Sequence, residues 1–470
     1  MRIAALFFAL ALAACGRDLP LPVENSRELV VLTRAGLTTY TVDSQGGAGG
    51  FEYDLVREFA KDQGLKIRII STADDTDLLT RLKQGEGHLA VAWSSPAEDP
   101  EIRSSTPYFQ SSNLIVTHEA SLPLRTAKQL NKRTVHVIAG SRQERSLQKM
   151  RKRVSSLSIA AVQDTNELAL MEGAASRRFE AILISDAAFK IGGNFYPELQ
   201  DAMELGVKQP IVWLFAPEVS PEFLVKANDF LARMASSGEL DRLKDRYFGH
   251  VDRLTTDDVS IFIEQMRNTL PQYRPLFQEA QIQTGIDWRL LAALAYQESR
   301  WEPLATSPTG VRGIMMLTAD TADSLRVRNR LDPAQSIRAG AQYLSDLRDS
   351  LPAEIREPDR LWLALAAYNL GMGHLNGARY LARTLGADPD SWYEMKKVLP
   401  LLAKPQYYKR LKSGKGRGGE AVIMTENIRV YADILNRFEP PYEPMKRKSE
   451  KFIWKSFQAR PDTDAAPAVP

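Results

Sequence analysis

The sequence predicts a multidomain protein in which an α/β domain precedes a mainly α-helical domain. Between residues 28 and 250, short β-branched and apolar runs alternate with amphipathic stretches, which is typical of largely parallel sheets covered by helices. After His250 the β-rich runs stop and helical periodicity dominates. The chain has 470 residues, too many for one ordinary hydrophobic core, so two or more domains are expected.

The α/β part contains a series of runs with the length and composition of strands. Strands are predicted at Leu29–Thr33, Lys66–Ile70, Leu89–Trp93, Leu114–Thr117, Val135–Ile138, Ile159–Val162, Ala181–Ile184 and Ile211–Phe215. Helices are predicted at Tyr53–Gln63, Asp77–Gln84, Gln143–Arg153 and Pro221–Tyr247.

The second part is predicted to be built from helices. These are Pro271–Gln283, Asp287–Glu298, Ala334–Leu351, Arg360–Leu370 and Ala421–Phe438. Asp287 suits an N-cap, because its carboxylate can accept from the free N–H groups of the first turn. Pro333 follows Asp332 and suits a first helical turn, where its missing N–H removes no hydrogen bond.

The N-terminus has the pattern of an exported lipoprotein. A short cationic start and an apolar run predict a signal peptide over residues 1–14. The sequence Leu-Ala-Ala before Cys15 resembles the lipobox of bacterial lipoproteins, so Cys15 is expected to carry lipid, with residues 15–26 as a tether. Gly16 in place of Asp favours the cell outer membrane, with the protein facing the periplasm. Cys15 is the single cysteine, so no internal disulfide can form.

Two other segments are expected to lie outside the folded domains. Residues 252–268 are predicted to be a linker, and residues 441–470 a partly disordered tail whose end is rich in Pro and Ala. The α/β domain would then occupy residues 27–251 and the helical domain residues 269–440.

Composition excludes several classes of function. The net charge is +3, which favours an acidic polymer as partner only weakly, and no basic stripe interleaved with aromatic residues indicates nucleic-acid binding. No glycine-rich phosphate-binding loop is present, so no nucleotide cofactor is expected. No metal is expected either, because the five histidines are scattered without ligand spacing, at His88, His118, His136, His250 and His374.

Glu298 is the residue that points most directly to chemistry. Leu291 and Leu294 share its side of the predicted helix, so its carboxyl lies on a face that helices usually bury. Burial disfavours an ionised carboxyl and raises its pKa, which suits a group that donates a proton at neutral pH. The alternative is a glutamate at a helix end that pairs with Arg300 or Arg312.

Three motifs follow one another in order from Glu298. They are Glu298-Ser299 with Pro303, Ala305, Ser307, Gly310, Gly313-Ile-Met315 and Thr321-Ala322; then Ala366-Ala-Tyr368-Asn369-Leu-Gly371; then Glu426-Asn-Ile-Arg-Val-Tyr431. Over roughly residues 270–440 they resemble the catalytic signature of soluble-lytic-transglycosylase-like domains, relatives of goose-type lysozyme that cleave peptidoglycan. One departure is Met316, where many members carry Gln.

The resemblance implies a lysozyme-like fold with a single catalytic carboxyl, Glu298. In that family the glutamic acid protonates the bond between N-acetylmuramic acid and N-acetylglucosamine, and the substrate's acetamide stabilises the cation. The resulting carboxylate deprotonates the C6 hydroxyl, which closes a 1,6-anhydro ring without water. The sequence offers no clear second carboxylate, since Glu302, Asp320 and Asp323 suit solvated or capping positions.

By matched position, the resemblance also implies a set of substrate-binding residues. Each has a structural alternative: turn capping for the serines, a plain turn for the glycine, a helix cap for the asparagine and core packing for the methionine and tyrosines. They are Ser299, Ser307, Gly313, Met316, Tyr368, Asn369 and Tyr431.

The α/β part resembles a second family. The element order and the motifs Gly50-Phe-Glu-Tyr-Asp54 and Ser105-Thr-Pro-Tyr108 are similar to family 3 extracellular solute-binding proteins, which are two-lobed and hold a ligand between the lobes. By this resemblance Arg103 would meet a ligand carboxylate, although it is displaced from the usual spacing. Asp186 would meet an ammonium group or, alternatively, cap a strand end. Ser141 opens a helix whose N-terminus could bind an anion.

The order of signal, solute-binding and transglycosylase segments resembles the membrane-bound lytic murein transglycosylases. It implies a peptidoglycan lyase whose first domain binds a muropeptide or amino acid and regulates the second. Two alternatives stay open: a hydrolytic muramidase, which leaves reducing ends, and a binding lipoprotein with an inactive helical domain.

Overall fold

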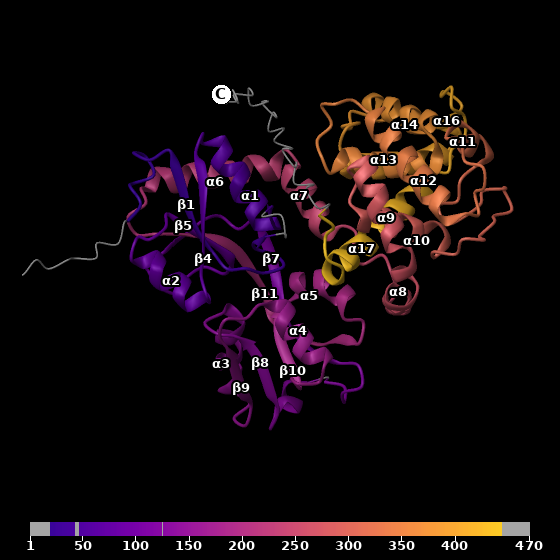
Figure 1. Ribbon diagram of the computed structural model, residues 1–470. Helices are drawn as coiled ribbons and strands as arrows, with labels where there is room; N and C mark the ends of the chain where they lie inside the picture. The colour runs from indigo at the N-terminus through magenta and orange to yellow at the C-terminus, as the bar shows by residue number, and fades with distance from the viewer. Residues whose placement is uncertain (1–18, 43–46, 125, 444–470) are drawn as a thin grey trace, which may run out of the picture.

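The protein has an α/β domain of two lobes and a helical domain beside it (Figure 1). The computed structural model describes residues 19–42, 47–124 and 126–443. The signal peptide, Cys15 and residues 444–470 of the predicted tail lie outside the described residues. The architecture confirms the predicted fold class, a two-lobed α/β domain followed by a mainly α domain.

The strands of the first domain are rich in buried apolar residues, as expected when helices cover both faces of a sheet. The main strands are β1 (Glu28–Thr33), β4 (Lys66–Ser71), β5 (Leu89–Ser94), β7 (Phe109–His118), β8 (Thr134–Ile138), β9 (Ser158–Val162), β10 (Ala181–Ser185) and β11 (Leu199–Phe215). The short ones are β2 (Thr41–Val42), β3 (Ala48–Gly49) and β6 (Arg103–Ser104).

The main strands follow one path, β4-β1-β5-β11-β7-β10-β8-β9, with β6 beside β11, whereas β2 and β3 form a separate two-stranded sheet. Neighbouring strands at the two ends of the path pair in parallel, whereas β11 pairs antiparallel with both β5 and β7. β11 has 17 residues and therefore runs from one lobe into the other. One hydrophobic cluster fills the first lobe, and another lies on one side of the second lobe. Further buried residues of the second lobe join the core of the helical domain.

Helices cover the sheets of both lobes. They are α1 (Phe51–Asp62), α2 (Asp75–Lys83), α3 (Arg142–Arg151), α4 (Glu167–Ala175), α5 (Asp186–Gly192), α6 (Pro221–Ser236) and α7 (Glu239–Phe248), with 3₁₀ turns η1 (Ala127–Leu130) and η2 (Gly193–Phe195). The helix predicted at Pro221–Tyr247 is in fact two helices. Gly238 has φ 78°, a conformation that glycine adopts easily, and it separates α6 from α7.

The second domain is a bundle of helices. They are α8 (Thr256–Asn268), α9 (Leu270–Thr284), α10 (Trp288–Ser299), α11 (Ala319–Ser324), α12 (Pro333–Asp349), α13 (Asp359–Leu370), α14 (Met372–Thr384), α15 (Trp392–Val398), η3 (Leu399–Ala403), α16 (Pro405–Tyr408) and α17 (Gly418–Phe438). Asp287 caps α10, accepting from Arg289 N at 2.8 Å, and Pro333 opens α12 after its cap Asp332. Of the helices in the described ranges, none combines the length and hydropathy needed to cross a membrane.

The segment predicted to be a linker, residues 252–268, is largely the helix α8. Thr255 caps this helix, and its apolar face is buried in the core of the helical domain. Phe262 packs at 4.5 Å between ring centroids against both Tyr296 and Tyr431. The prediction missed this helix, and only the partner helices make the burial of its apolar face evident.

The helix α17 joins the two domains. One of its faces packs against α10, while residues spaced four apart on another face contact both lobes of the first domain. These contacts are Arg429 Nη2 to Arg246 O (2.8 Å) and Asp433 Oδ2 to His250 Nε2 (2.6 Å), near the end of the first lobe, and Arg437 Nη2 to Tyr196 Oη (3.1 Å) in the second lobe.

Candidate active site

Glu298 lies in the last turn of α10, at the end of its buried face. Leu291 and Leu294 of this face are fully buried, and the carboxyl follows them to the point where the protein meets solvent. The helix stops there because Arg300 takes a left-handed conformation with φ 54°. The position is the one predicted, and the Glu298 side chain remains partly exposed.

The carboxyl of Glu298 has no charged or hydrogen-bonding partner among the described residues. Burial raises its pKa to about 8, and burial is the only cause of the shift. The alternative in which Arg300 or Arg312 pairs with Glu298 is therefore wrong for this structure, since a cation at that distance would lower the pKa. At neutral pH most of this carboxyl is protonated and can donate a proton.

In the part of the chain that the structure describes, no second carboxylate interacts with Glu298. A nearby anion would add to the rise in pKa, and none does. Glu302, Asp320 and Asp323 are exposed, and Glu302 accepts from Leu304 N at 3.1 Å, as expected for residues that solvate or cap a turn. The site thus holds one carboxyl that can transfer a proton.

A loop spanning residues 301–317 packs against the end of α10. Ser299 Oγ lies 2.8 Å from Ile314 O and 3.1 Å from Ala295 O, so its proton holds the loop to the helix. Gly313 has φ 83°, and a Cβ at this position would lie 1.8 Å from Arg330 O. Ser299 and Gly313, predicted to touch substrate, therefore first serve to shape the loop beside Glu298.

Tyr368 closes the other side of the site from the end of α13. Its Oη donates to Met315 O at 2.8 Å, which ties α13 to the loop. Burial and, second, the negative charge of Glu298 raise the pKa of Tyr368, which places its hydroxyl within electrostatic reach of the carboxyl. Its ring also packs at 5.3 Å against Tyr343 of α12. Tyr343 was missed because no motif marks it, although it is partly exposed on the same side.

The other predicted contacts differ in exposure. Asn369 is exposed and follows Tyr368 directly, and Met316 is partly exposed with φ 47°. Ser307 Oγ accepts from Thr309 N at 3.2 Å and from Val311 N at 3.3 Å, so it stabilises its own turn. Asn369 and Met316 are thus more available to a substrate than Ser307.

Tyr431 is buried, although its matched position implied contact with the substrate. It is 7% exposed, and it packs against Phe262 and Tyr296 at centroid distances of 4.5 Å and 4.9 Å. Burial first and then Tyr296 raise its pKa, without a contribution from Glu298. Tyr431 therefore supports α10 from behind, and it is Tyr368 that faces the carboxyl.

The cleft between the two lobes is closed by ion pairs that the sequence did not reveal. Arg34 follows β1 in the first lobe, and its guanidinium contacts Asp75 of the same lobe (3.2 Å) and Glu167 of the second lobe (2.9 Å). All three residues are buried. Because Arg34 and Glu167 belong to different lobes, their contact holds the lobes together.

Asp186 lies in the same cleft, next to a second arginine. Asp186 Oδ1 accepts from Ser111 Oγ at 2.5 Å, and Arg142 Nη2 donates to the same Oγ at 3.0 Å. Arg142 is 3% exposed, yet no carboxylate lies within ion-pair distance and its Nε has no hydrogen-bond partner in the structure. Burial lowers the pKa of Arg142 to about 10, and Asp186 partly opposes this effect.

The other two predicted ligand residues are used elsewhere. Arg103 donates to the backbone oxygens of Val219 and, at 3.4 Å, Pro217, so its guanidinium braces the first lobe instead of facing a ligand. Ser141 Oγ accepts from Glu144 N (3.1 Å) and donates to Ile138 O (2.6 Å), which makes it an N-cap of α3. Ser141 therefore opens a helix as predicted, and anion binding there stays a prediction. Arg103 is used elsewhere because local spacing does not reveal which backbone groups come within its reach.

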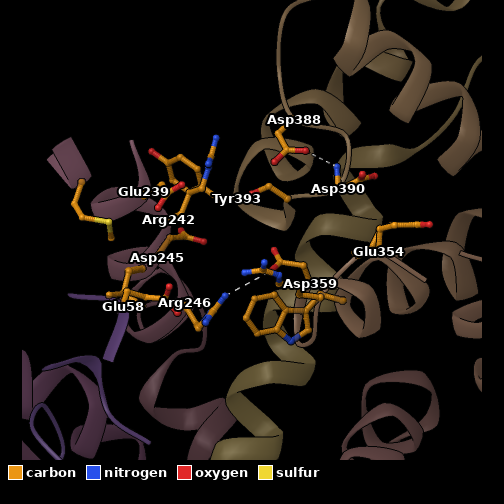
Figure 2. A pocket seen from close by; sticks show the side chains of 16 residues that line it. Glu58, Glu239, Arg242, Asp245, Arg246, Glu354, Asp359, Asp388, Asp390 and Tyr393 are labelled. Atoms are coloured by element: carbon orange, nitrogen blue, oxygen red, sulfur yellow. Dashed lines mark hydrogen bonds and ion pairs between the residues drawn. The ribbon is translucent and has the colours of Figure 1, made fainter. Parts of the chain in front are cut away.

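Two cavities lie at the boundaries between folded units. One of about 220 Å³ in the interlobe cleft is bordered by Asp75, Ser95 and Arg145 above an apolar floor. The other, of about 340 Å³, separates the first lobe from the helical domain, and Figure 2 shows carboxylates and arginines around it. Arg246 reaches Asp359 across this cavity at 3.5 Å. This part of the boundary is polar, whereas buried apolar residues of the second lobe share one hydrophobic core with the helical domain.

Across the described ranges, no three His, Cys, Asp or Glu side chains are grouped so that they could hold a metal ion. Glu298 and Tyr368 are the protein groups that set the electrostatics of the site.

Comparisons with known proteins match both domains. Residues 275–389 match the family described as Transglycosylase SLT domain, and residues 29–250 match the family Bacterial extracellular solute-binding proteins, family 3. Among solved structures, the chain is similar to an ancestral arginine-binding protein bound to arginine, with a TM-score of 0.43 and 22% identity over 47% of this chain and 98% of that one.

Proteins called membrane-bound lytic murein transglycosylase F are similar over nearly the whole chain. The one from Thiobacillus denitrificans is 42% identical over 94% of this chain and 95% of its own length. Those from Nitrosospira multiformis and Methylobacillus flagellatus are 38% and 39% identical, over 96% and 95% of this chain and 97% and 96% of their own lengths. The chain therefore belongs to the membrane-bound lytic murein transglycosylase F family of peptidoglycan lytic transglycosylases.

Proposed function

We propose that this protein cleaves the bond between N-acetylmuramic acid and N-acetylglucosamine with Glu298 as its only acid and base. One observation carries the proposal: a partly exposed carboxyl with no ionic partner, whose pKa burial alone raises to about 8. Such a group is protonated at neutral pH, as a general acid must be, and becomes a base once it has given up its proton.

The reaction balances without water or a cofactor. Glu298 donates its proton to the glycosidic oxygen, the bond from that oxygen to C1 breaks, and the substrate's acetamide stabilises C1. The Glu298 carboxylate then takes the proton of the C6 hydroxyl, and O6 bonds to C1 to give a 1,6-anhydro end. Both steps use the same carboxyl, which regains its proton in the second step. The attack of O6 on C1 is favoured by proximity, because both atoms belong to one sugar.

The residues around Glu298 hold the groove in shape and bind the glycan. Tyr368 and Ser299 tie α13 and α10 to the loop, so that its backbone faces the carboxyl. Gly313 lets the loop pass close to Arg330 O. Asn369 and Met316 extend from this frame toward solvent and are proposed to meet the sugars, while Ser307 contributes through its turn.

The products of digestion test this proposal. The protein without its signal peptide would be incubated with purified peptidoglycan, and the released muropeptides weighed by mass spectrometry. Products lighter by one water and without a reducing end are expected. Reducing ends would instead identify a hydrolytic muramidase. If neither product formed, or if Glu298→Gln left activity unchanged, the reading as a binding lipoprotein with an inactive helical domain would prevail.

For the first domain, we infer that the interlobe cleft binds a muropeptide or amino acid and regulates cleavage. Asp186 is available for an ammonium group, and Arg142, which replaces Arg103 in this role, for a carboxylate. A ligand would compete with the Arg34–Glu167 pair and so change how the lobes meet. Since α17 contacts both lobes and packs on α10, a lobe movement could be transmitted to Glu298. Absence of heat on titration with stem peptides would contradict this role.

The localisation is also a proposal. Lipid on Cys15 would attach the protein to the cell outer membrane on its periplasmic side, where peptidoglycan is present, and residues 15–26 would give it reach. Labelled palmitate should enter the wild-type protein and not Cys15→Ser, and the variant should leave the membrane fraction. A protein that stays in the outer membrane without label would disprove the anchor.

A further inference from the structure

A strongly basic segment, residues 404–417, lies on the helical domain and has no role in the site described above. No Asp or Glu occurs between Glu394 and Glu420, although the whole chain is nearly balanced at +3. The basic segment contains Lys404, Lys409, Arg410, Lys412, Lys415 and Arg417.

The charges of the basic segment are exposed and mostly unpaired. Arg417 pairs with Glu420 at 3.2 Å, whereas the other five have no hydrogen bond or ion pair in the part of the chain that the structure describes. Like charges this close repel one another and oppose folding of the segment. An anionic partner would relieve that repulsion. A surface that is only solvated does not need so many positive charges close together.

The basic segment is anchored beside the catalytic groove. A Cβ at Gly416 would lie 3.0 Å from His374 Nδ1, and one at Gly377 would lie 2.6 Å from Ser413 Oγ, so the segment packs on the start of α14. α14 begins directly after α13, whose last turn holds Tyr368 and Asn369. Figure 1 shows α16, at the start of the segment, at the end of the helical domain away from the first domain. The segment therefore packs on the helix that directly follows Tyr368 and Asn369 of the groove, at the end of the helical domain away from the first domain (Figure 1).

We propose that the basic segment binds the carboxylates of the stem peptides on the glycan being cleaved. This rests on the proposed function, because it concerns the same substrate and the same groove. The sugars inside the groove meet Glu298 and Tyr368, whereas the peptides of neighbouring muramic acid units extend from the glycan and carry free carboxylates. Lys and Arg side chains at the rim attract such groups through hydrogen bonds and charge.

This binding should depend on salt. Exposed charges interact over roughly 8–10 Å at physiological ionic strength and much less at high salt. Peptide-bearing chains should therefore bind more tightly at low salt, and peptide-free chains should show little dependence on salt.

The experiment measures binding to the full mature chain carrying Glu298→Gln, so that the result does not depend on catalysis. Peptide-bearing glycan chains and the same chains stripped of peptides by an amidase would be titrated in low salt. In this background K409Q/R410Q/K412Q/K415Q should weaken binding to peptide-bearing chains about tenfold, because each exposed ion pair changes an equilibrium constant by a factor of about 1.4–5. Binding to stripped chains should not change.

A matched control removes four exposed, unpaired bases from the first domain: K128Q/R151Q/K152Q/R153Q. It should leave both affinities unchanged, and both variants should keep the parent's unfolding temperature. Replacing Lys409, Lys412 and Lys415 by Arg should preserve binding.

Three results for K409Q/R410Q/K412Q/K415Q would overturn the proposal. Its affinity for peptide-bearing and stripped glycan chains could be unchanged, or could fall equally for both. It could also lose only its binding to vesicles of phosphatidylglycerol. The last would identify a membrane contact instead. Failure of the transglycosylase reaction itself would appear in the product masses of the unmutated enzyme, independently of these affinities.

Discussion

The catalytic groove and the interlobe cleft both bury carboxylates but treat them differently. In the groove Glu298 is left without a cation, and burial raises its pKa to about 8. In the cleft Glu167 and Asp75 share the guanidinium of Arg34, in an arrangement that closes the two lobes on each other. Burial also raises the pKa of Asp75, and Arg34 opposes that rise. The paired carboxylates hold structure together, whereas the unpaired Glu298 keeps a proton that it can transfer.

The largest effect is expected from Glu298→Gln on activity. Gln has nearly the same shape but neither donates a proton as an acid nor accepts one as a base, so turnover should fall at least about 1,000-fold. The rate of anhydro-muropeptide release measures it. Glu302→Gln is the matched control, since Glu302 is exposed and should retain close to full activity. A large loss in the control would mean that a second carboxylate takes part.

A glutamate-to-glutamine substitution in the cleft, Glu167→Gln, should lower stability. Glu167→Gln removes the partner of Arg34 in the other lobe, and Arg34 keeps Asp75. Breaking half of this buried arrangement should lower the free energy of unfolding of the first domain by about 2–3 kcal/mol. Chemical denaturation checks the value, and small-angle scattering should show opened lobes. If stability and shape stay unchanged, the pair does not hold the lobes.

Unlike Glu167→Gln, Glu298→Gln should raise the free energy of unfolding relative to wild type, and this gain should grow as the pH rises. The pKa of Glu298 is raised from 4.5 to about 8, so the folded state keeps a proton that the unfolded state loses between these values. The contribution of Glu298 to the stability of the wild type is therefore fully present below pH 4.5 and is lost as the pH rises to about 8. Relative to wild type, the variant should gain about 4 kcal/mol between pH 5 and pH 9, because Gln does not ionise. If the free energies of unfolding of the two proteins differ by the same amount at every pH, this expectation is wrong.

Tyr368→Phe should show a smaller effect. It removes the hydrogen bond to Met315 O, which holds the loop beside Glu298, and leaves the packing against Tyr343. Activity should fall about tenfold, roughly what the loss of one hydrogen bond of 1–1.5 kcal/mol produces. Tyr431→Phe serves as the comparison, because Tyr431 packs against Phe262 and Tyr296 and Glu298 does not contribute to the shift in its pKa. Equal losses in both variants would remove the distinction between the two tyrosines.

Much of the fold could be predicted because local patterns and burial agree. The strands and most helices follow runs whose periodicity matches their final burial, and Asp287 and Pro333 begin their helices as expected. The helix α8 escaped prediction, since its apolar side is completed only by Tyr296 and Tyr431 from distant parts of the chain.

The sequence by itself determined the two-domain order and the identity of Glu298 as the acid candidate, because apolar periodicity and ordered motifs lie within short stretches. Tertiary structure decided that Tyr368 rather than Tyr431 faces that carboxyl, and that Arg34 and Arg142 rather than Arg103 lie in the cleft. The reason is physical. Arg34 and Glu167 are 133 residues apart, so their contact depends on how the lobes close, which no local pattern records.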